Sequence, residues 1–293
     1  MNPPYQEWSL DTRRLGRRVL VFDRLDSTNN LAASLADDPA HDGLAILAKE
    51  QTAGRGQHGR TWLAAPGQSV LLSLLIAPPP ELCRPVVLTA WAAVAVCATI
   101  QQAIGQPARI KWPNDVLLYQ RKVCGILIES IAGRQARKGN SPLFPYQGGN
   151  LPRSLWFIVG IGLNVQQSAE AFAAAGLPEA TSLAQFATRP LDTHAIAIDL
   201  IRQLDRDYDT LCWGGLDTLE RRWKEHLGLL GKPVVVECPN TNYHGRLVEL
   251  SFRGVELVRP EGASLVLAPE RIQHLHEAAQ ATNPPPGPSR RWG

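Results

Sequence analysis

Several features that would place the chain in a specialised class are missing from its sequence. No apolar run approaches the roughly 20 residues of a membrane span, and the charged N-terminus does not resemble a signal peptide. The five cysteines are odd in number, far apart and without a Cys-x-x-Cys pair, so neither a disulfide framework nor a zinc knuckle is predicted. We therefore expect a cytoplasmic protein with no membrane partner.

The sequence also lacks a large excess of positive or negative charge. Its formal net charge is only +3 over 293 residues, and its paired arginines are scattered. Nucleic-acid-binding proteins usually carry a concentrated basic surface, so we predict no DNA partner. The hydrophobic fraction of 44% is that of an ordinary globular protein. The length allows one large domain with a small second one.

The pattern of apolar residues predicts an α+β fold. Short runs typical of strands occur at 19–22, 44–48, 70–76, 109–111, 124–130 and 156–159. Helices are expected after residues 26–30, over 86–104, and over 193–213 and 216–226. The helix at 86–104 contains the most apolar stretch, which a buried core helix explains better than a membrane span. These segments predict a mixed sheet with helices in one domain over 19–229, after an N-terminal extension over 1–18.

The pattern changes at Gly231. Short β-type runs follow at 232–237, 243–251, 254–258 and 264–267, separated by turn residues. They predict a small all-β barrel over 230–277. The remaining residues, 278–293, are rich in Ala, Gln, Pro and Ser and are expected to form a disordered tail.

A glycine-rich basic segment lies between two predicted strands. It reads Lys49-Glu-Gln-Thr-Ala-Gly-Arg-Gly-Gln-His-Gly-Arg-Thr-Trp62. Glycines let backbone N–H groups approach an anion, and arginines supply forked donors for phosphate or carboxylate oxygens. The segment matches neither the Walker pattern nor Gly-x-Gly-x-x-Gly. From the residues alone it is an anion-binding loop or a flexible basic surface loop.

A second group of polar residues is Lys111-Trp-Pro-Asn-Asp115, followed by Arg121 and Lys122. Pro113 and Asn114 predict a turn, so the two lysines would flank a tight hairpin and converge on one carboxylate. Lysine is a compact cation suited to charge that grows on a carboxyl or phosphoryl oxygen. The alternative is a solvated hairpin tip with ordinary surface lysines.

Two shorter motifs complete the set. The strand at 159–165 contains Gly-Ile-Gly-Leu-Asn, whose glycines leave space against the backbone or mark a bulge, with Asn164 at its end. Ser27-Thr28-Asn29 stands at a helix start, where short polar side chains cap the helix or bind a small polar ligand.

In order and spacing, these four motifs resemble those of biotin–protein ligases, over roughly residues 19–276. The resemblance implies a catalytic domain similar to class II aminoacyl-tRNA synthetases and lipoate ligases, with an SH3-like C-terminal barrel. It implies that biotin is activated with Mg²⁺ and ATP to biotinyl-5'-AMP. The biotinyl group would then pass to a lysine of the biotin carboxyl carrier protein of acetyl-CoA carboxylase.

The resemblance also assigns roles to individual residues. Arg55 and Lys122 are the expected catalytic residues, because two cations would offset the repulsion between biotin's carboxylate and the α-phosphate. Asp115 is the expected Mg²⁺ ligand. The biotin-binding set is Ser27, Thr28, Asn29, Gln51, Arg55, Gly56, Gln57 and Lys122. The ATP- and adenylate-binding set is Arg60, Trp62, Lys111, Asn114, Asp115 and Asn164.

The sequence departs from the family pattern in three places. Gln57 stands where the family usually has arginine, which puts retention of the adenylate in question. The segment 132–155 is longer than usual and is expected to be an exposed insertion. Only about 18 residues precede the first predicted strand, so no N-terminal DNA-binding domain is expected.

Two other functions stay open at this point. A lipoate–protein ligase would share the fold and the chemistry but lack the Gly-Arg-Gly loop and the Lys-Trp-Pro-Asn-Asp motif. A non-catalytic protein that binds biotin or its adenylate would not need Lys122. An ATP-dependent biotin exchange assay separates the enzymes from the binding protein. The sequence does not decide whether the chain forms a homodimer.

Overall fold

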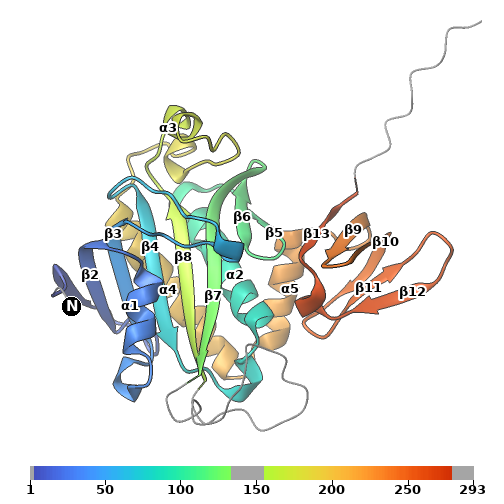
Figure 1. Cartoon of the computed structure of the whole chain (residues 1–293), viewed down its shortest axis with the longest axis horizontal. Coiled ribbons are helices and arrows are strands. Elements are labelled where there is room, and N and C mark those ends of the chain that lie inside the picture. Colours follow the sequence, from blue (N-terminus) through green and yellow to red (C-terminus); the bar gives the residue numbers. More distant parts are fainter. Residues whose placement is uncertain (1–2, 133–154, 279–293) are drawn as a thin grey trace, which may run out of the picture.

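The computed structural model describes residues 3–132 and 155–278 as a large mixed sheet with helices and a smaller sheet beside it (Figure 1). The large sheet has the order β1-β2-β3-β4-β8-β7-β6-β5. Its strands are β1 (Gln6–Ser9), β2 (Arg18–Leu25), β3 (Leu44–Gln51), β4 (Ser69–Ile76), β5 (Arg109–Lys111), β6 (Asp115–Leu118), β7 (Arg121–Ala132) and β8 (Leu155–Asn164). Only β2 and β3 pair in parallel; the other neighbouring pairs are antiparallel. The predicted mixed α+β architecture is confirmed. The insertion expected at 132–155 and the tail expected at 278–293 lie, apart from their boundary residues, outside the described residues.

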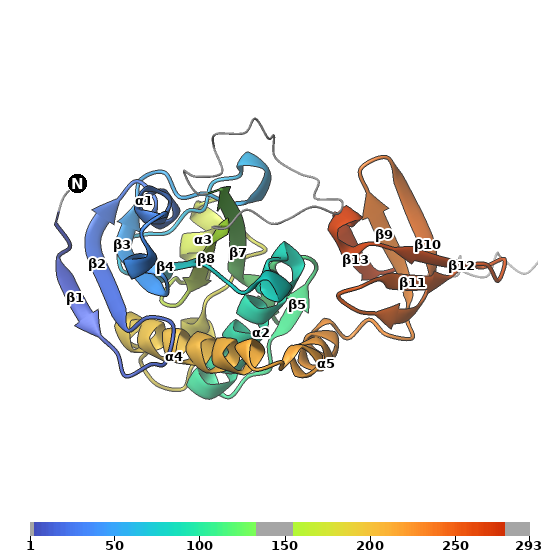
Figure 2. The ribbon, with the colours of Figure 1, turned by 90° about the horizontal axis from the view of Figure 1, so that it is seen from below.

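Helices cover the large sheet unequally. α2 (Pro85–Ile104), α4 (Thr193–Cys212) and α5 (Leu216–Leu227) lie on one face, and α1 (Thr28–Leu35) lies on the other (Figure 2). The short α3 (Ala169–Ala174) follows β8. Strand β4 is buried along its whole length, as its mostly apolar sequence predicts. On the face that carries α1, the loop between β3 and β4 crosses in front of the sheet (Figure 1).

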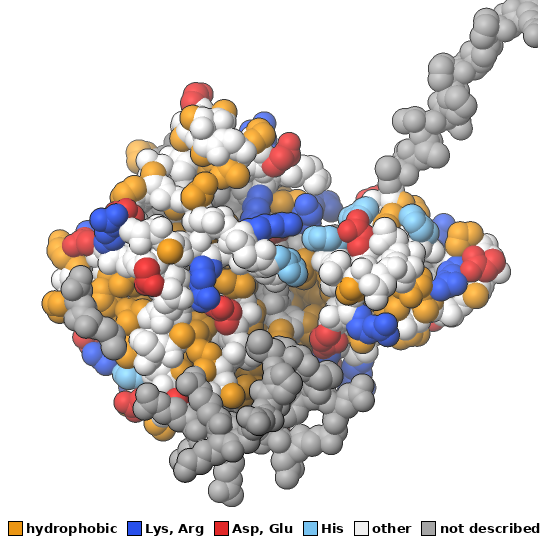
Figure 3. Space-filling view, in the orientation of Figure 1, with side chains coloured by type: hydrophobic (Ala, Val, Ile, Leu, Met, Phe, Trp, Pro, Cys, Tyr) orange, Lys and Arg blue, Asp and Glu red, His pale blue; other side chains and the backbone are white. Residues whose placement is uncertain are grey.

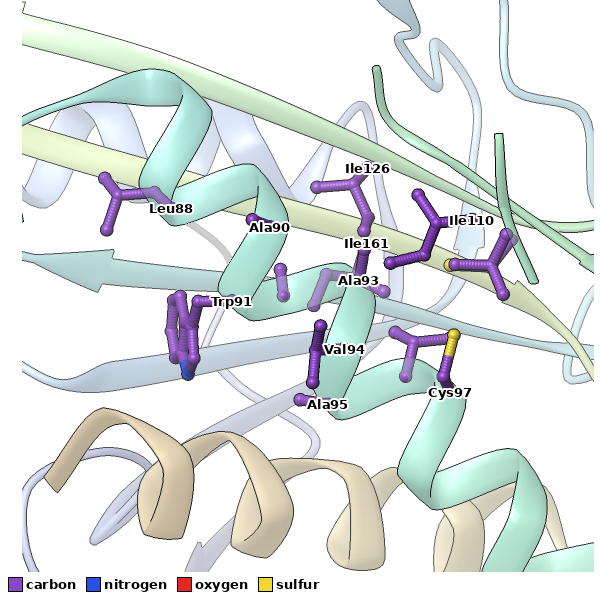
Figure 4. Packing of buried hydrophobic residues seen from close by; sticks show 14 of the residues in the cluster. Leu88, Ala90, Trp91, Ala93, Val94, Ala95, Cys97, Ile110, Ile126 and Ile161 are labelled. Atoms are coloured by element: carbon purple, nitrogen blue, oxygen red, sulfur yellow. The ribbon is translucent and has the colours of Figure 1, made fainter. Parts of the chain in front are cut away.

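The most apolar segment forms the core helix α2. Pro85 occupies its first turn, where a missing N–H costs nothing. Among the described residues this is the one helix long and apolar enough to cross a membrane, but 67% of its most apolar window is buried inside the protein. Figure 4 shows Ala93 facing Ile126 and Ile161 of the sheet. On its other side, Trp91 donates its indole N–H to a carbonyl of α4 at 3.2 Å, so the expected core helix is confirmed.

A second, antiparallel sheet follows α5 and has the order β12-β11-β10-β9-β13. Its strands are β9 (Pro233–Cys238), β10 (Thr241–Leu250), β11 (Val255–Val258), β12 (Ser264–Leu267) and β13 (His274–Glu277). Trp223 of α5 stacks on Phe252 with 4.9 Å between ring centroids. Trp112 donates its indole N–H to the carbonyl of Ile272 at 3.2 Å. These contacts join this C-terminal module (residues 230–277) to the large sheet through one apolar core.

Four short elements, β1, β6, α3 and β13, are not predicted from the sequence. Each has six residues or fewer, which is too short for a clear periodicity. The runs expected at 156–159 and 159–165 form the single strand β8. Strand β1 belongs to the N-terminal extension, whose later part is fixed because Asp205 accepts the backbone N–H groups of Arg13, Arg14 and Leu15 at 2.7 to 2.8 Å.

Candidate functional site

A cavity opens on the face of the large sheet that carries α1. Its floor is formed by β4, β7 and β8, and its rim by the start of α1 and the loop between β3 and β4. Apart from its polar residues, the cavity is lined by apolar side chains and glycines. This is the usual composition of a small-molecule site in which a few polar groups orient the ligand. Ten residues of the predicted site line it: Ser27, Thr28, Asn29, Gln51, Arg55, Gly56, Gln57, Trp62, Asn114 and Lys122.

The segment from Ser27 to Asn29 opens α1 and forms the polar wall of this cavity. Ser27 stands at the N-cap but makes no side-chain capping hydrogen bond. Thr28 donates its backbone N–H to Oε1 of Gln51 at 2.7 Å, and Asn29 donates a side-chain N–H to Oε2 of Glu129 at 2.7 Å. Because all three polar side chains of the segment are buried, they cost free energy unless they are hydrogen-bonded. Helix capping therefore does not explain the motif.

Two ionisable groups that adjoin cavity residues in the sequence, Asp26 next to Ser27 and Cys124 next to Gly125, have shifted pKa values. The side-chain amide of Asn30 donates to Asp26 at 2.6 Å and lowers the pKa of that carboxyl group. Complete burial raises the pKa of the Cys124 thiol well above its usual range. Asp26 is therefore ionised at neutral pH, and Cys124 is a protonated thiol rather than a nucleophile.

The loop between β3 and β4 folds back on itself before it crosses the cavity. Gly56 donates its backbone N–H to the carbonyl of Arg60 at 2.7 Å, and Trp62 donates to the carbonyl of Gly54 at 3.0 Å. A Cβ atom at residue 54 would lie 2.5 Å from the carbonyl oxygen of Trp62. His58 has a positive φ of 55° at the turn. Close backbone approach thus requires glycine at 54, which is the physical meaning of that part of the motif.

Arg55 extends from this loop to the sheet. Its Nη2 lies 2.5 Å from Oε2 of Glu129 on β7, so a carboxylate already holds this cation. The sequence analysis missed Glu129, although a signal is present. Residues alternate between the two faces of a strand, and Gly125, Leu127 and Glu129 therefore share the face that looks toward the cavity. Glu129 is the carboxylate in this otherwise apolar row of residues. A carboxylate in such a row indicates a ligand-binding residue or an ion pair.

Trp62 lies flat on a platform of two glycines at the cavity floor. A Cβ atom at Gly162 would lie 2.4 Å from Cε2 of Trp62, and one at Gly125 would lie 2.9 Å from Cζ3. Gly162 of the Gly-Ile-Gly-Leu-Asn motif and Gly125 of the Gly-Ile-Leu run thus make room for an aromatic ring, whereas Gly160 makes room for the side chain of Asn29. The indole Nε1 is buried without a hydrogen-bond partner among the described residues.

The predicted tight hairpin between Lys111 and Lys122 is wrong. Two turns lie in this interval, with β6 between them: one at Pro113 and Asn114, and one at Tyr119 and Gln120, which both have positive φ. The extra strand lies between the two lysines, and Lys111 is paired directly with Asp115 across β5 and β6. Lys111 is exposed on the edge strand β5 and lies outside the cavity lining.

Lys122 does reach the carboxylate expected for it. Its Nζ lies 2.6 Å from Oδ1 of Asp115, and its backbone is fixed by hydrogen bonds to Glu179 and Thr181. Asn114 donates its side-chain amide to the carbonyl of Ile126 at 2.6 Å, which ties the turn to β7. The cavity wall therefore holds the Lys122 cation in a fixed pair with Asp115, which itself lies outside the cavity lining.

Asn164 stands at the end of β8, as the sequence predicts, but lies outside the cavity lining. It is only 4% exposed. Its amide donates to the carbonyl of Thr181 at 3.0 Å, and its Oδ1 lies 3.4 Å from the hydroxyl of Ser69. In this arrangement its side chain supports the backbone around the site.

An open groove of about 1080 Å³ continues from the cavity toward the C-terminal module. The loop residues 52–61 line one side of it, and residues 270–273 of the module line the other. Arg60 and His58 face this groove rather than the inner cavity. Figure 3 shows Lys and Arg side chains gathered on this face close to the junction of the two sheets.

The described residues contain no group of three His, Cys, Asp or Glu side chains that could enclose a metal ion. Asp115 is 22% exposed at its side chain and paired with Lys122. Magnesium keeps several waters and is usually held by one or two carboxylates together with substrate phosphates. Asp115 therefore fits a Mg²⁺ ion that arrives with a polyphosphate.

Comparison with known proteins agrees with the geometry. Residues 21–141 match the model of the biotin/lipoate A/B protein ligase family. The chain is 31% identical over 267 residues to the biotin–[acetyl-CoA-carboxylase] ligase of Paracoccus denitrificans, covering 85% of this chain and 98% of that protein. It is 30% identical over 251 residues to the bifunctional ligase/repressor of Bacillus subtilis, covering 86% and 72% respectively. A biotin protein ligase from Aquifex aeolicus, solved in complex with biotin and ATP, shares the fold with a TM-score of 0.66 at 23% identity, covering 89% of this chain and 99% of that chain.

Proposed function

The chain belongs to the biotin–protein ligase family, and we propose that it activates biotin with ATP to biotinyl-5'-AMP and biotinylates a carrier lysine. The proposed acceptor is the biotin carboxyl carrier protein of acetyl-CoA carboxylase. The observation that carries this proposal is the convergence of three motifs on one cavity. Thr28, Arg55 and Lys122 come from separate parts of the chain and line the same space.

The charges in the cavity suit a reaction between two anions. Biotin's carboxylate has to approach the α-phosphate of ATP, and the cations Arg55 and Lys122 face the space where they would meet. Each cation is held by a carboxylate, Glu129 at 2.5 Å and Asp115 at 2.6 Å. Their positions are thus fixed before substrates arrive, which is the arrangement that stabilises charge in a transition state most effectively.

The proposed chemistry has two steps. An oxygen of biotin's carboxylate attacks the α-phosphorus, and the bond from that phosphorus to the bridging oxygen breaks, releasing pyrophosphate. The neutral amine of the carrier lysine then attacks the carbonyl carbon of the mixed anhydride, and AMP leaves. Asp115 would hold Mg²⁺ together with the phosphates of ATP, and the ion would neutralise part of the phosphate charge.

The loop at 54–60 is proposed to shield the anhydride from water. Its fold-back at Gly54 and its contact with Glu129 through Arg55 place it across the cavity mouth. Exclusion of water protects a reactive intermediate and strengthens electrostatic interactions. Four residues of the predicted site lie outside the cavity lining: Arg60, Lys111, Asp115 and Asn164. Because Arg60 lines the groove, we propose that ATP approaches from that side.

We also propose the finer assignments that the sequence suggested. Residues 19–229 would form the catalytic domain, similar to class II aminoacyl-tRNA synthetases, and residues 230–277 an SH3-like barrel, which the five-stranded antiparallel sheet supports. A cytoplasmic location and the absence of a DNA partner remain predictions. The oligomeric state, including a homodimer, is likewise a question for solution experiments.

One experiment tests the proposal directly. The protein is incubated with biotin, Mg²⁺, ATP and an isolated biotin carboxyl carrier domain, and the mass of the carrier is then measured by mass spectrometry. We expect a gain of one biotinyl group on one lysine, and no gain when ATP is omitted. A carrier whose mass is unchanged at saturating biotin overturns the proposal.

Two companion measurements separate the alternatives. Lipoic acid replaces biotin in a parallel reaction with a lipoyl carrier domain, and modification there alone would identify a lipoate ligase. Biotin-dependent exchange of labelled pyrophosphate into ATP tests the first step by itself. Biotin binding without any exchange would identify a non-catalytic binding protein.

A further inference from the structure

A row of four oxygen atoms runs behind the polar wall of the cavity. In order along the row they are Gln51 Oε1, Thr28 Oγ1, Ser73 Oγ and Asn29 Oδ1. The three successive distances are 3.0, 2.7 and 2.5 Å, which are all hydrogen-bond distances. Ser73 lies on β4, is completely buried and does not line the cavity. The row therefore connects a buried hydroxyl to three side chains that line the cavity.

Both ends of the row are fixed as acceptors. Oε1 of Gln51 accepts the backbone N–H of Thr28 at 2.7 Å, so the amide oxygen must point this way. Asn29 turns its NH₂ group toward Glu129, because a carboxylate that also binds Arg55 can only accept. The Asn29 oxygen consequently faces Ser73. Glu129 thus sets the orientation of the Asn29 amide.

The row has three oxygen-to-oxygen contacts and only two hydroxyl protons to fill them, because serine and threonine each donate one. Asn29 Oδ1 is buried and can only accept, and Ser73 is its hydrogen-bond partner among the described residues, so the Ser73 proton is needed there. The Thr28 proton can reach Ser73 Oγ at 2.7 Å or Gln51 Oε1 at 3.0 Å, and we assign it to the shorter of these two contacts. The longest contact, between Thr28 and Gln51, is left without a proton, and Gln51 tolerates this because it already accepts a backbone N–H.

We propose that Ser73 is a positioning residue that fixes the hydrogen-bond direction of the cavity wall, so that Thr28 Oγ1 and Gln51 Oε1 both present lone pairs to the ligand. Two acceptors 3.0 Å apart call for a ligand with N–H donors. This inference rests on the proposed function, since biotin's ureido ring carries two N–H groups. It adds that residues without ligand contact, Ser73 and Glu129, determine that preference.

The test is a double-mutant cycle read by the dissociation constant of biotin, measured by titration calorimetry on the full chain without ATP. In Ser73→Ala the Thr28 proton is free to fill the contact with Gln51, so the acceptor pair is lost. We expect biotin affinity to fall about tenfold, the size of one neutral hydrogen bond with an unpaired partner. Thr28→Val removes the hydroxyl itself. If Ser73 acts through Thr28, adding Ser73→Ala to Thr28→Val causes no further loss.

A matched control is Ser69→Ala, because Ser69 is a buried serine on the same strand that hydrogen-bonds to two amide side chains. Its biotin affinity should equal that of wild type. If the alanine protein at 73 does not fold, Ser73→Cys keeps a weak donor and is expected to give a smaller loss. An unchanged affinity in the variant at 73, or losses that add in the double variant, overturns the inference. Wild-type protein that binds no biotin at all refutes the proposed function instead.

Discussion

The ammonium nitrogen of Lys122 lies 2.6 Å from Oδ1 of Asp115 and 5.8 Å from the centre of the Trp62 ring. A carboxylate on one side and an aromatic face on the other hold this cation at the cavity wall. An ammonium group has three N–H donors, so donors remain for a substrate oxygen. This fixed cation is the feature on which the proposed adenylation depends most directly.

Replacing Lys122 by alanine should abolish most adenylation while the protein still folds. A charge-assisted contact is worth about 1.5 to 3 kcal/mol, so we expect biotin-dependent pyrophosphate exchange to fall at least tenfold. Lys232→Ala is the matched control, because Lys232 forms a 2.7 Å ion pair with Glu277 at a side-chain exposure of 38%, against 36% for Lys122. An exchange rate for the variant at 122 within about threefold of wild type would remove Lys122 from the proposed mechanism.

The glycine platform under Trp62 predicts a second effect. In Gly162→Ala the new methyl group would lie 2.4 Å from the indole ring, so the ring must move off the sheet. Overpacking of this kind costs about 1 to 3 kcal/mol. We expect a lower melting temperature together with about a tenfold loss of pyrophosphate exchange, as Trp62 shifts into the ligand space.

A second substitution identifies the clash as the cause. Adding Trp62→Leu to Gly162→Ala removes the ring and should recover the melting temperature without recovering activity. Gly254→Ala serves as the control, because its methyl group would meet Val266 Cγ1 at 3.0 Å and a backbone oxygen at 3.9 Å, a milder contact than the 2.4 Å at Gly162. Normal activity and stability of Gly162→Ala would show that Trp62 does not rest on this platform in solution.

His226 predicts a pH dependence of stability. Burial lowers the pKa of this imidazole below its usual value of 6.5, and the opposing hydrogen bond to the carbonyl of Ala108 only partly compensates. The folded protein therefore binds fewer protons here than the unfolded chain, and stability from this residue is lost as pH falls below about 6.5. His226→Gln should flatten the decline of melting temperature between pH 7.5 and pH 5.5. His244→Gln, at an exposed position, should follow wild type, and equal curves for all three proteins would contradict the assignment.

The sequence locates most of the cavity because its motifs carry local constraints. Thr28, Gln51 and Lys122 each follow or precede a strand whose apolar run is easy to recognise, and strand ends in one sheet lie close together. Gly54 and Gly162 are readable as positions of close approach, although the partner that approaches, Trp62, is not. The core helix α2 is predicted nearly to the residue because Pro85 marks its start and its apolar run is long.

What the sequence does not predict depends on pairing across the sheet. The sequence predicts a single tight hairpin between Lys111 and Lys122, but the four-residue strand β6 intervenes, and too few residues form it for a period to be seen. Glu129 and Ser73 sit within apolar strands, where a lone polar residue is easily taken for a solvent-facing one. Their roles appear only when β4, β7 and α1 are placed side by side.

Gln57 is the position at which this chain departs from its family's usual arginine. The residue lines both the inner cavity and the outer groove, directly after Gly56. The neighbouring His58 and Arg60 line only the groove. The loop therefore presents a neutral side chain where the family pattern supplies a charge beside the anionic intermediate.

Gln57→Arg should consequently slow the release of biotinyl-5'-AMP by about tenfold, since charge-assisted hydrogen bonds are worth about 1.5 to 3 kcal/mol and neutral ones about 0.5 to 1.5 kcal/mol. The measurement is the dissociation rate of adenylate formed on the protein, followed by rapid filtration without carrier. Gln273→Arg is the control, because it adds the same charge to the other side of the groove, and its effect should be much smaller.

A salt titration separates a direct contact from a long-range charge effect. If the new guanidinium contacts the phosphate directly, added salt should reduce the difference in release rate between the two arginine variants only slightly, whereas a long-range charge effect would be largely lost. Equal release from wild type and Gln57→Arg would mean that the side chain at 57 does not contact the intermediate.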